Sequence, residues 1–265
     1  MMKLERLAMG CVVAGAMIAG IGSARADCKD LPSWDDLHRA LKQAVFDETS
    51  GLNNHMWGTI VDLSGKVCAV AFSGQDFTDQ WLGSRVISAQ KANTANAFSL
   101  GPSASNGSGQ PTGLALSTAN LYTAVQPGQS LFGLQESNPV DPSVAYAGLE
   151  GQFGTAKDPL GAKRVGGINV FGGGLGLYRG GDKVGGVGVS GDTSCADHMI
   201  GWRVRFYLGL DQLSGVGGVA GDPARPDNII YDIVDDANGH PVSTSGFGHP
   251  RCLNTADPRK LPPVR

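Results

Sequence analysis

The chain has 265 residues, of which 41% are hydrophobic and 17% charged, and its 21 basic and 24 acidic residues give a net charge of −3. This composition predicts a folded protein with a sizeable core, and it argues against disorder and against nucleic-acid binding, which needs a clustered basic surface. Glycine is abundant, with 40 residues, but no Gly-X-Y period accompanies it, which excludes collagen. We therefore expect glycine at tight turns and at close backbone approaches.

The first 26 residues have the pattern of a secretory signal peptide. Lys3 and Arg6 precede an apolar run over residues 7–21, and Ala-Arg-Ala at positions 24–26 is a suitable cleavage site. The run has about 15 residues, fewer than the ~20 that span a bilayer, which disfavours an uncleaved membrane anchor. We expect a mature chain that begins near Asp27, is periplasmic or secreted, and has no membrane attachment after cleavage.

Four cysteines follow the cleavage site: Cys28, Cys68, Cys195 and Cys252. An even number in an exported protein predicts two disulfides, and three pairings are possible. We favour Cys28–Cys68 and Cys195–Cys252, because the second bond would attach an irregular C-terminal tail to the body of the protein. A zinc site is the less favoured alternative, since there is no Cys-x-x-Cys pair and the spacings are wide.

Two helices and a hairpin are predicted in the first hundred residues. Ser33 can cap a helix over residues 34–48, where apolar side chains recur at helical spacing. Residues 57–63 and 67–72 are β-rich and are separated by a short Ser-Gly turn, which predicts a hairpin. Residues 77–100 repeat the helical pattern until a Gly-Pro pair ends it.

The rest of the chain is less regular. Residues 101–163 are rich in glycine and proline and predict a long excursion with one short helix and one strand. Three β-like runs follow within residues 164–190, and Asp192 or Thr193 can cap a helix that ends near residue 210. The remaining tail is mostly irregular, with one possible strand at residues 229–234.

This order of elements predicts an α+β fold, in which helices pack on one antiparallel sheet of about five strands. We divide the chain into a signal peptide (1–26), a domain (27–208) with the long excursion inside it, and a C-terminal extension (209–265). Helices do not alternate singly with strands, which argues against a doubly wound parallel sheet.

Motifs of catalysis are not evident in this sequence. There is no His-Glu-x-x-His, Gly-x-Ser-x-Gly or Cys-x-x-Cys-His, so an enzymatic role is not favoured. Residues 186–191 match Gly-x-Gly-x-x-Gly, but short loops rather than a βαβ unit precede them, so we interpret the match as a tight turn before a helix. His38 and His198 are the candidate iron ligands, and a packed or surface histidine is the alternative for each.

Three separated blocks resemble the GlcG/HbpS-type heme-binding family. Residues 88–98 (SAQKANTANAF) resemble its A-x-x-K-A-x-T-A-x-x-F helix, and residues 131–135 (LFGLQ) are similar to a short element that follows it. Residues 171–191 (FGGGLGLYRGGDKVGGVGVSG) look like its glycine-rich block, and Asp197 falls near its usual acid. The resemblance implies profilin-like α/β/α layers, homo-oligomers and, in some exported members, heme or iron binding.

Heme needs an apolar slot, partners for two propionates and an iron ligand. The predicted heme-binding residues are Lys91, Thr94, Phe98, Gly172, Gly173, Gly174, His38 and His198, with the two histidines as metal ligands. The first three would lie on one helix face, while the glycines would let backbone approach a flat ring or would only turn a strand. The sequence thus predicts an exported, non-covalent heme-binding protein for heme capture, storage or sensing. The alternatives are an enzyme or enzyme-accessory subunit that binds a small carboxylate, and a structural subunit.

Overall fold

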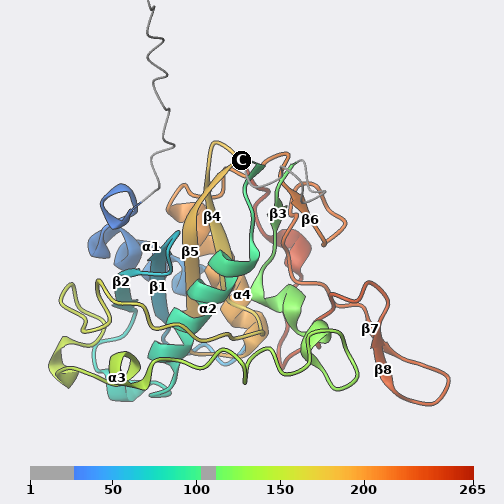
Figure 1. Cartoon of the computed structure of the whole chain (residues 1–265), viewed down its shortest axis with the longest axis horizontal. Coiled ribbons are helices and arrows are strands. Elements are labelled where there is room, and N and C mark those ends of the chain that lie inside the picture. The colour runs from blue at the N-terminus through green and yellow to red at the C-terminus, as the bar shows by residue number, and fades with distance from the viewer. Residues whose placement is uncertain (1–26, 103–111) are drawn as a thin grey trace, which may run out of the picture.

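The structure is a computed structural model that describes residues 27–102 and 112–265, so the predicted signal peptide lies outside the described residues. Its centre is one antiparallel sheet with the strand order β2-β1-β5-β4 (Figure 1). The strands are β1 (Trp57–Asp62), β2 (Val67–Phe72), β4 (Gly174–Arg179) and β5 (Asp182–Ser190). Helix α2 (Ser84–Phe98) packs on one face, and α1 (Trp34–Asp47) and α4 (Ser194–Tyr207) pack on the other. The fold is therefore α+β in α/β/α layers, as the sequence predicts.

Helix α1 begins where its capping residues predict. The Ser33 hydroxyl accepts the backbone N–H of Asp36 at 3.3 Å, and the Asp36 carboxylate accepts the backbone N–H of Ser33 at 3.1 Å. This reciprocal pair satisfies two N–H groups that the helix leaves without partners. Leu37, Leu41 and Ala44 follow at helical spacing and are fully buried against the sheet. Capping and apolar spacing together account for this helix.

Glycines on β4 and β5 let α2 lie directly on the sheet. A Cβ atom at Gly188 would stand 2.0 Å from the carbonyl oxygen of Ser88, and one at Gly186 would stand 2.4 Å from that of Ala92. Both distances are far below van der Waals contact, so any side chain would push the helix away. The Gly-x-Gly-x-x-Gly pattern therefore serves helix–sheet packing.

Replacing Gly188 by alanine should destabilise the fold. The added methyl group would overlap the α2 backbone, and forced overpacking of this kind costs about 1–3 kcal/mol or more. Urea unfolding of the Gly188→Ala chain measures the loss. Gly151→Ala is the matched control, because a Cβ at Gly151 meets no atom within 4 Å. Equal stabilities for the two variants would contradict this account of the packing.

The main sheet has four strands rather than about five. Residues 164–171, predicted as a strand, contribute only isolated bridges, from Arg164 to Lys66 and from Gly166 to Val140. Gly166 and Gly167 have φ angles of 68° and 77°, and this left-handed conformation interrupts a strand. The second predicted helix is also shorter: residues 77–79 form a separate 3-10 turn, η2 (Phe77–Asp79), before α2 begins at Ser84.

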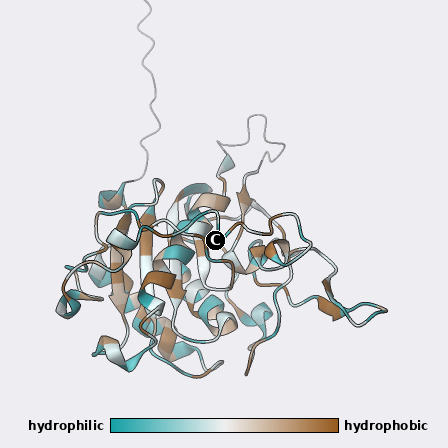
Figure 2. Cartoon of the chain, turned by 60° about the horizontal axis from the view of Figure 1, so that its bottom comes forward, coloured by the Kyte–Doolittle hydropathy of each residue, from teal (hydrophilic) through white to brown (hydrophobic). Residues whose placement is uncertain are grey.

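In the described residues of the long excursion and in the tail, the regular elements are all small. These are β3 (Leu114–Ala115), α3 (Pro142–Ala145), β6 (Gly217–Gly218), β7 (Ile233–Asp235), β8 (Pro241–Ser243) and several 3-10 turns. Strands β7 and β8 form a hairpin that projects from the body, with apolar strands and a hydrophilic tip (Figure 2). The strand predicted at residues 229–234 is thus β7, shifted toward the C-terminus.

Both favoured disulfides are present. Cys28 and Cys68 join the 3-10 turn η1 (Cys28–Asp30) to β2, and Cys195 and Cys252 join the first turn of α4 to the tail. The preferred pairing is therefore confirmed. In both cases a segment with little regular structure of its own is linked to a core element.

The C-terminal extension shares the core of the domain. Leu213 and Leu261 are buried, and the indole N–H of Trp202 on α4 donates to the carbonyl of Pro262 at 3.0 Å. Arg205 on α4 also forms a fully buried ion pair with Asp227, at 2.6 Å. The extension is irregular, as predicted, but it completes one folding unit with residues 27–208. In the part of the chain that the structure describes, no helix has the length and apolar character to cross a membrane.

Candidate functional site

A buried ion pair lies where β5 ends and β4 begins. The Lys91 ammonium on α2 stands 2.6 Å from the carboxylate of Asp197 on α4, and it donates to the carbonyl of Val189 at 3.1 Å. Asp197 also accepts the backbone N–H of Asp192 at 2.9 Å. A Cβ at Gly173 would lie 2.3 Å from the carbonyl oxygen of Val189 and 3.0 Å from the Lys91 nitrogen, so glycine is needed there. We call Lys91, Asp197 and Gly173 the buried polar centre.

Burial controls the electrostatics of this centre. It raises the pKa of Asp197 to about 6, and the nearby Lys91 ammonium offsets only part of that rise. Burial likewise lowers the pKa of Lys91, against the opposing effect of Asp197. The Phe171 ring covers the ammonium at 4.7 Å. The pair is hydrogen-bonded and shielded from water, an arrangement that fixes α2 and α4 relative to the sheet.

The residues predicted to line the heme slot lie near one another, but the space between them is filled. Thr94 donates to the carbonyl of Gln90 at 2.7 Å and accepts the backbone N–H of Asn169 at 3.0 Å. Phe98 packs into the apolar cluster around Leu116 and Val170. The segment 164–171 thus lies along the helix face that the sequence predicted to be open.

The glycine block is equally closed. A Cβ at Gly172 would stand 2.1 Å from the carbonyl oxygen of Ser194, and one at Gly174 would stand 2.5 Å from that of Lys91. The two glycines hold the backbones of α4 and α2 at contact distance from the sheet. No ring of heme size fits between α2 and the glycine block in this conformation.

The two candidate histidine ligands lie apart from each other in the described structure. His38 is half-buried on α1 and stacks on Trp34, with ring centroids 4.7 Å apart. The Nε2 atom of His198 accepts the backbone N–H of Ile229 at 3.1 Å and lies 3.2 Å from the side-chain oxygen of Asn228. Burial lowers the pKa of His198 to about 3, so the ring is neutral at pH 7. Neither ring lies in either of the two cavities described below.

The tail brings a third histidine toward the buried polar centre. His249 is 1% exposed, and its ring lies 5.0 Å from that of Tyr122. Burial lowers its pKa to about 4, and the Lys91 ammonium adds to that decrease. No local motif marks this residue in the sequence, since its neighbours are glycine and proline. Only the fold of the tail brings it close to the start of α4.

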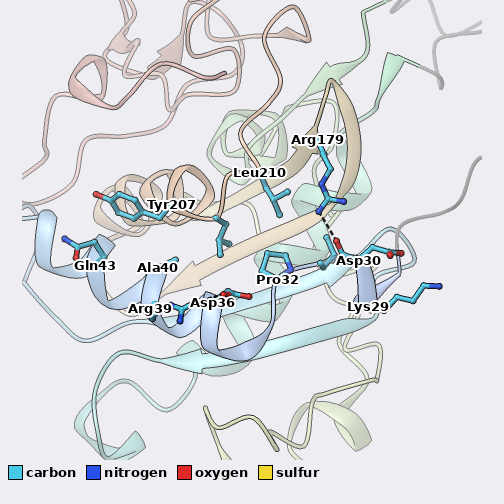
Figure 3. A pocket seen from close by; sticks show the side chains of 12 residues that line it. Lys29, Asp30, Pro32, Asp36, Arg39, Ala40, Gln43, Arg179, Tyr207 and Leu210 are labelled. Atoms are coloured by element: carbon cyan, nitrogen blue, oxygen red, sulfur yellow. Dashed lines mark hydrogen bonds and ion pairs between the residues drawn. The ribbon is translucent and has the colours of Figure 1, made fainter.

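A polar groove of about 580 Å³ lies between α1 and the ends of β4 and α4 (Figure 3). Leu31, Ala40 and Leu210 are among the apolar residues that line it, and Arg39 and Arg179 are among the basic ones. Arg179 donates to the carbonyl of Asp30 at 2.9 Å, and Arg39 pairs with Asp36 at 2.5 Å. The Tyr207 hydroxyl at one end donates to the carboxylate of Asp47. The groove therefore combines arginines, their acidic neighbours Asp30 and Asp36, and an apolar surface.

An aromatic pocket of about 350 Å³ lies on the α2 side of the sheet. Trp57 on β1, Phe77 on η2 and Phe153 line it. Leu82 and Tyr146 also line it and are 66% and 71% exposed, so apolar surface continues from the pocket to the outside. The pocket is therefore an apolar, aromatic cavity with an open rim.

Two polar groups of the aromatic pocket matter for a ligand. Arg85 forms a bidentate ion pair with Asp158, and its guanidinium stands 4.0 Å from the centre of the Phe153 ring. The indole N–H of Trp57 is buried and has no hydrogen-bond partner among the described residues. A buried donor without a partner is energetically costly.

One family model and several solved structures are similar to this chain. The model of a family described as "haem degrading protein HbpS-like" matches residues 34–203. A Klebsiella pneumoniae protein, ORFY, is 22% identical, with 66% of this chain and 86% of that chain covered and a TM-score of 0.42.

Two further solved structures are similar. A PduOC–heme complex is 23% identical, with 67% and 94% coverage and a TM-score of 0.43. A double mutant of Streptomyces reticuli HbpS is 16% identical, with 77% and 99% coverage and a TM-score of 0.40. No curated protein matches the chain. Because the family model matches residues 34–203, which are most of the described chain, the chain belongs to the HbpS-like family.

Proposed function

We propose that this chain is an exported protein that binds heme non-covalently, and that the aromatic pocket receives part of the heme ring. The HbpS-like family supports heme binding at the family level. The observation that carries the proposal for this chain is the aromatic pocket itself, because a porphyrin needs flat apolar walls and an open edge for its propionates. Trp57, Phe77 and Phe153 supply the walls, and the exposed rim leaves room for the charged edge.

Tyr146 is the candidate iron ligand. Its hydroxyl belongs to an exposed side chain at the rim, and tyrosine is one of the residues that hold heme iron in proteins. The residues that line the pocket include no histidine. His198 is committed to Ile229, and His38 is stacked on Trp34, so we assign neither to iron. When bound, the heme would supply a redox-active iron, and the pocket residues would orient it and exclude water.

Heme capture with later release suits this site better than tight storage. The rim residues Leu82 and Tyr146 are mostly exposed, so a ring held there stays partly accessible to a second protein. A homo-oligomer, implied by the family resemblance, remains part of the proposal and is tested by sedimentation equilibrium. Export is tested by N-terminal sequencing of the periplasmic or secreted product, which should begin near Asp27.

Hemin titration tests the proposal. The mature chain should give a saturable shift of the Soret band at micromolar hemin, and Tyr146→Phe should change the position of the band and weaken binding by about 10-fold or more, because the iron loses an axial ligand. Tyr207→Phe in the polar groove is the matched control and should behave like wild type. No saturable shift, or an equal loss in both variants, would argue against heme in the aromatic pocket.

A second candidate function is the binding of a small carboxylate in the polar groove. The observation that favours it is the pair of guanidinium groups, Arg39 and Arg179, beside apolar residues (Figure 3), since arginine recognises carboxylates through paired hydrogen bonds. A ligand that binds the native state raises the melting temperature. A thermal-shift screen of small organic acids should therefore give a rise that Arg179→Gln removes. A rise that persists in Arg179→Gln would place the ligand elsewhere.

A further inference from the structure

We propose that Cys195, Cys252 and His249 form a zinc site when the Cys195–Cys252 disulfide is reduced. The two sulfur atoms and one ring nitrogen of His249 all lie within 4.8 Å of one another. Thiolate and imidazole are the ligands that zinc prefers in proteins. Two residues of the tail and one residue of α4 would thus hold one metal ion. The site is separate from the aromatic pocket and does not depend on heme binding.

The imidazole of His249 has one ring nitrogen available to a metal ion. Its Nδ1 atom lies 2.7 Å from the carbonyl oxygen of Pro250, to which it donates its proton. That hydrogen bond leaves a lone pair on Nε2, which is buried and has no partner among the described residues. Metal-binding histidines typically donate their other ring N–H to a carbonyl or carboxylate in this way. A buried imidazole nitrogen without a partner, on a residue beside the two sulfurs, is the independent observation that favours a metal ion here.

The start of α4 holds the Cys252 sulfur in place by hydrogen bonds. The backbone N–H of Cys195, in the first turn of the helix, stands 3.2 Å from the Cys252 sulfur, and the Ser194 hydroxyl lies 3.5 Å from it. Backbone N–H groups at a helix N-terminus stabilise a nearby negative charge. A sulfur held in this position is a better metal ligand than an isolated thiol.

The chemistry balances with a dithiol as reductant. The dithiol loses two electrons and becomes a disulfide, while Cys195 and Cys252 each take one of its protons and become thiols. Zn²⁺ then displaces those two protons to solvent as it binds the two sulfurs and Nε2. Two thiolates and one divalent cation sum to zero charge, so the buried site carries no net charge. Three protein ligands leave a fourth position for water or another small ligand.

The tail is held in place by contacts other than the disulfide. Thr123 donates to the carbonyl of Gly248 at 2.6 Å, and the backbone N–H of His249 donates to that of Ile230 at 2.8 Å. Asn254 donates to the carbonyl of Thr49 at 3.2 Å. These bonds flank the cluster on both sides, so the three ligands stay together after reduction.

The other disulfide provides an internal comparison. Cys28 and Cys68 also have a potential third ligand nearby, Asp62. The Asp62 carboxylate, however, already accepts hydrogen bonds from Ser64 and the backbone N–H of Lys66. It also faces the Lys66 ammonium at 3.5 Å. Reduction exposes both cysteine pairs to metal, but only the pair beside His249 has a ligand that is free to bind.

The experiment titrates zinc into the mature chain before and after anaerobic reduction, in competition with a chromophoric chelator. The reduced chain should bind one zinc ion per chain with a raised melting temperature, and the oxidised chain should bind none at this site. Co²⁺ in place of zinc should give a thiolate charge-transfer band. His249→Gln should weaken binding by about 100-fold or more, since even outer partners of metal ligands are worth 10–100-fold.

Cys68→Ser is the matched control, and it should keep the zinc affinity of wild type, whereas Cys252→Ser should lose it. Circular dichroism of each reduced chain before and after zinc shows whether it is folded. The proposal is overturned by equal zinc binding in the oxidised chain, by wild-type affinity in His249→Gln, or by loss of binding in Cys68→Ser. It is also overturned when reduction abolishes the native spectrum and zinc fails to restore it.

Discussion

Replacing Lys91 by methionine is expected to lower the free energy of unfolding by about 3–5 kcal/mol. The change keeps the length of the side chain but leaves the Asp197 carboxylate, whose side chain is 2% exposed, without its cation, and removing one member of a buried pair costs this much. Chemical denaturation monitored by circular dichroism measures the loss. Replacing both residues, as Lys91→Met with Asp197→Leu, should recover much of it, because an apolar pair has no desolvation penalty.

An exposed ion pair serves as the control for this prediction. Arg259 pairs with Asp257 at 2.9 Å, but its side chain is 84% exposed, so Arg259→Gln should change stability by less than about 1 kcal/mol. Hemin binding by folded Lys91→Met should match that of wild type, because Lys91 does not line the aromatic pocket. If the Lys91→Met chain is fully stable but no longer binds hemin, the heme site lies on the face of α2 that the sequence predicts, and not in the aromatic pocket.

Acid should destabilise the protein through its two buried histidines. Burial lowers the pKa of His198 to about 3 and that of His249 to about 4, from 6.5. The unfolded state therefore takes up protons first as the pH falls below 6.5, and stability is lost down to the folded-state pKa values. Between pH 7 and pH 5 each histidine should remove about 2 kcal/mol from the free energy of unfolding.

The measurement compares the pH dependence of the free energy of unfolding between variants, because protonation of Asp197 stabilises the folded state whereas protonation of the histidines destabilises it. The pKa of Asp197 is raised to about 6, so its protonation below that pH favours the folded state. Subtracting the pH dependence of His198→Gln or His249→Gln from that of wild type cancels this contribution. His240→Gln is the control, since the His240 side chain is 74% exposed. Parallel curves for wild type and His198→Gln would show that His198 titrates normally in the folded state.

Local signals in the sequence were sufficient for the main elements. Ser33 and the apolar spacing after it specify α1, and the Ser-Gly turn after residue 62 specifies the β1–β2 hairpin, because capping and turn formation involve neighbours in the chain. The strand predicted at 164–171 was wrong because Gly166 and Gly167 adopt left-handed backbone. Glycine permits several conformations, and only tertiary contacts choose among them.

The candidate site was less predictable for a related reason. The sequence predicts that glycines such as Gly174 either approach a flat ligand or turn a strand, and in the structure Gly174 approaches the backbone of α2. A helix that packs closely on a sheet and a heme ring that packs closely on a strand both require glycine, because glycine has no side chain. The sequence therefore cannot distinguish the two. The aromatic pocket joins Trp57 to Phe153, and His249 meets Cys195 across the fold. Residues so far apart in the sequence do not form a local motif, so their proximity cannot be predicted from the sequence.

The participation of the tail in the core has a consequence for biogenesis. Leu261 fills a place beside α1 and α4, and Asp227 neutralises Arg205 within the same layer. Helix α1 therefore cannot make its contact with Leu261 until almost the whole polypeptide has been synthesised, because contacts so distant in sequence form late. For the export proposed above, this delay keeps the nascent polypeptide loose enough to thread a translocation channel. A version shortened before residue 227 should be degraded rather than delivered.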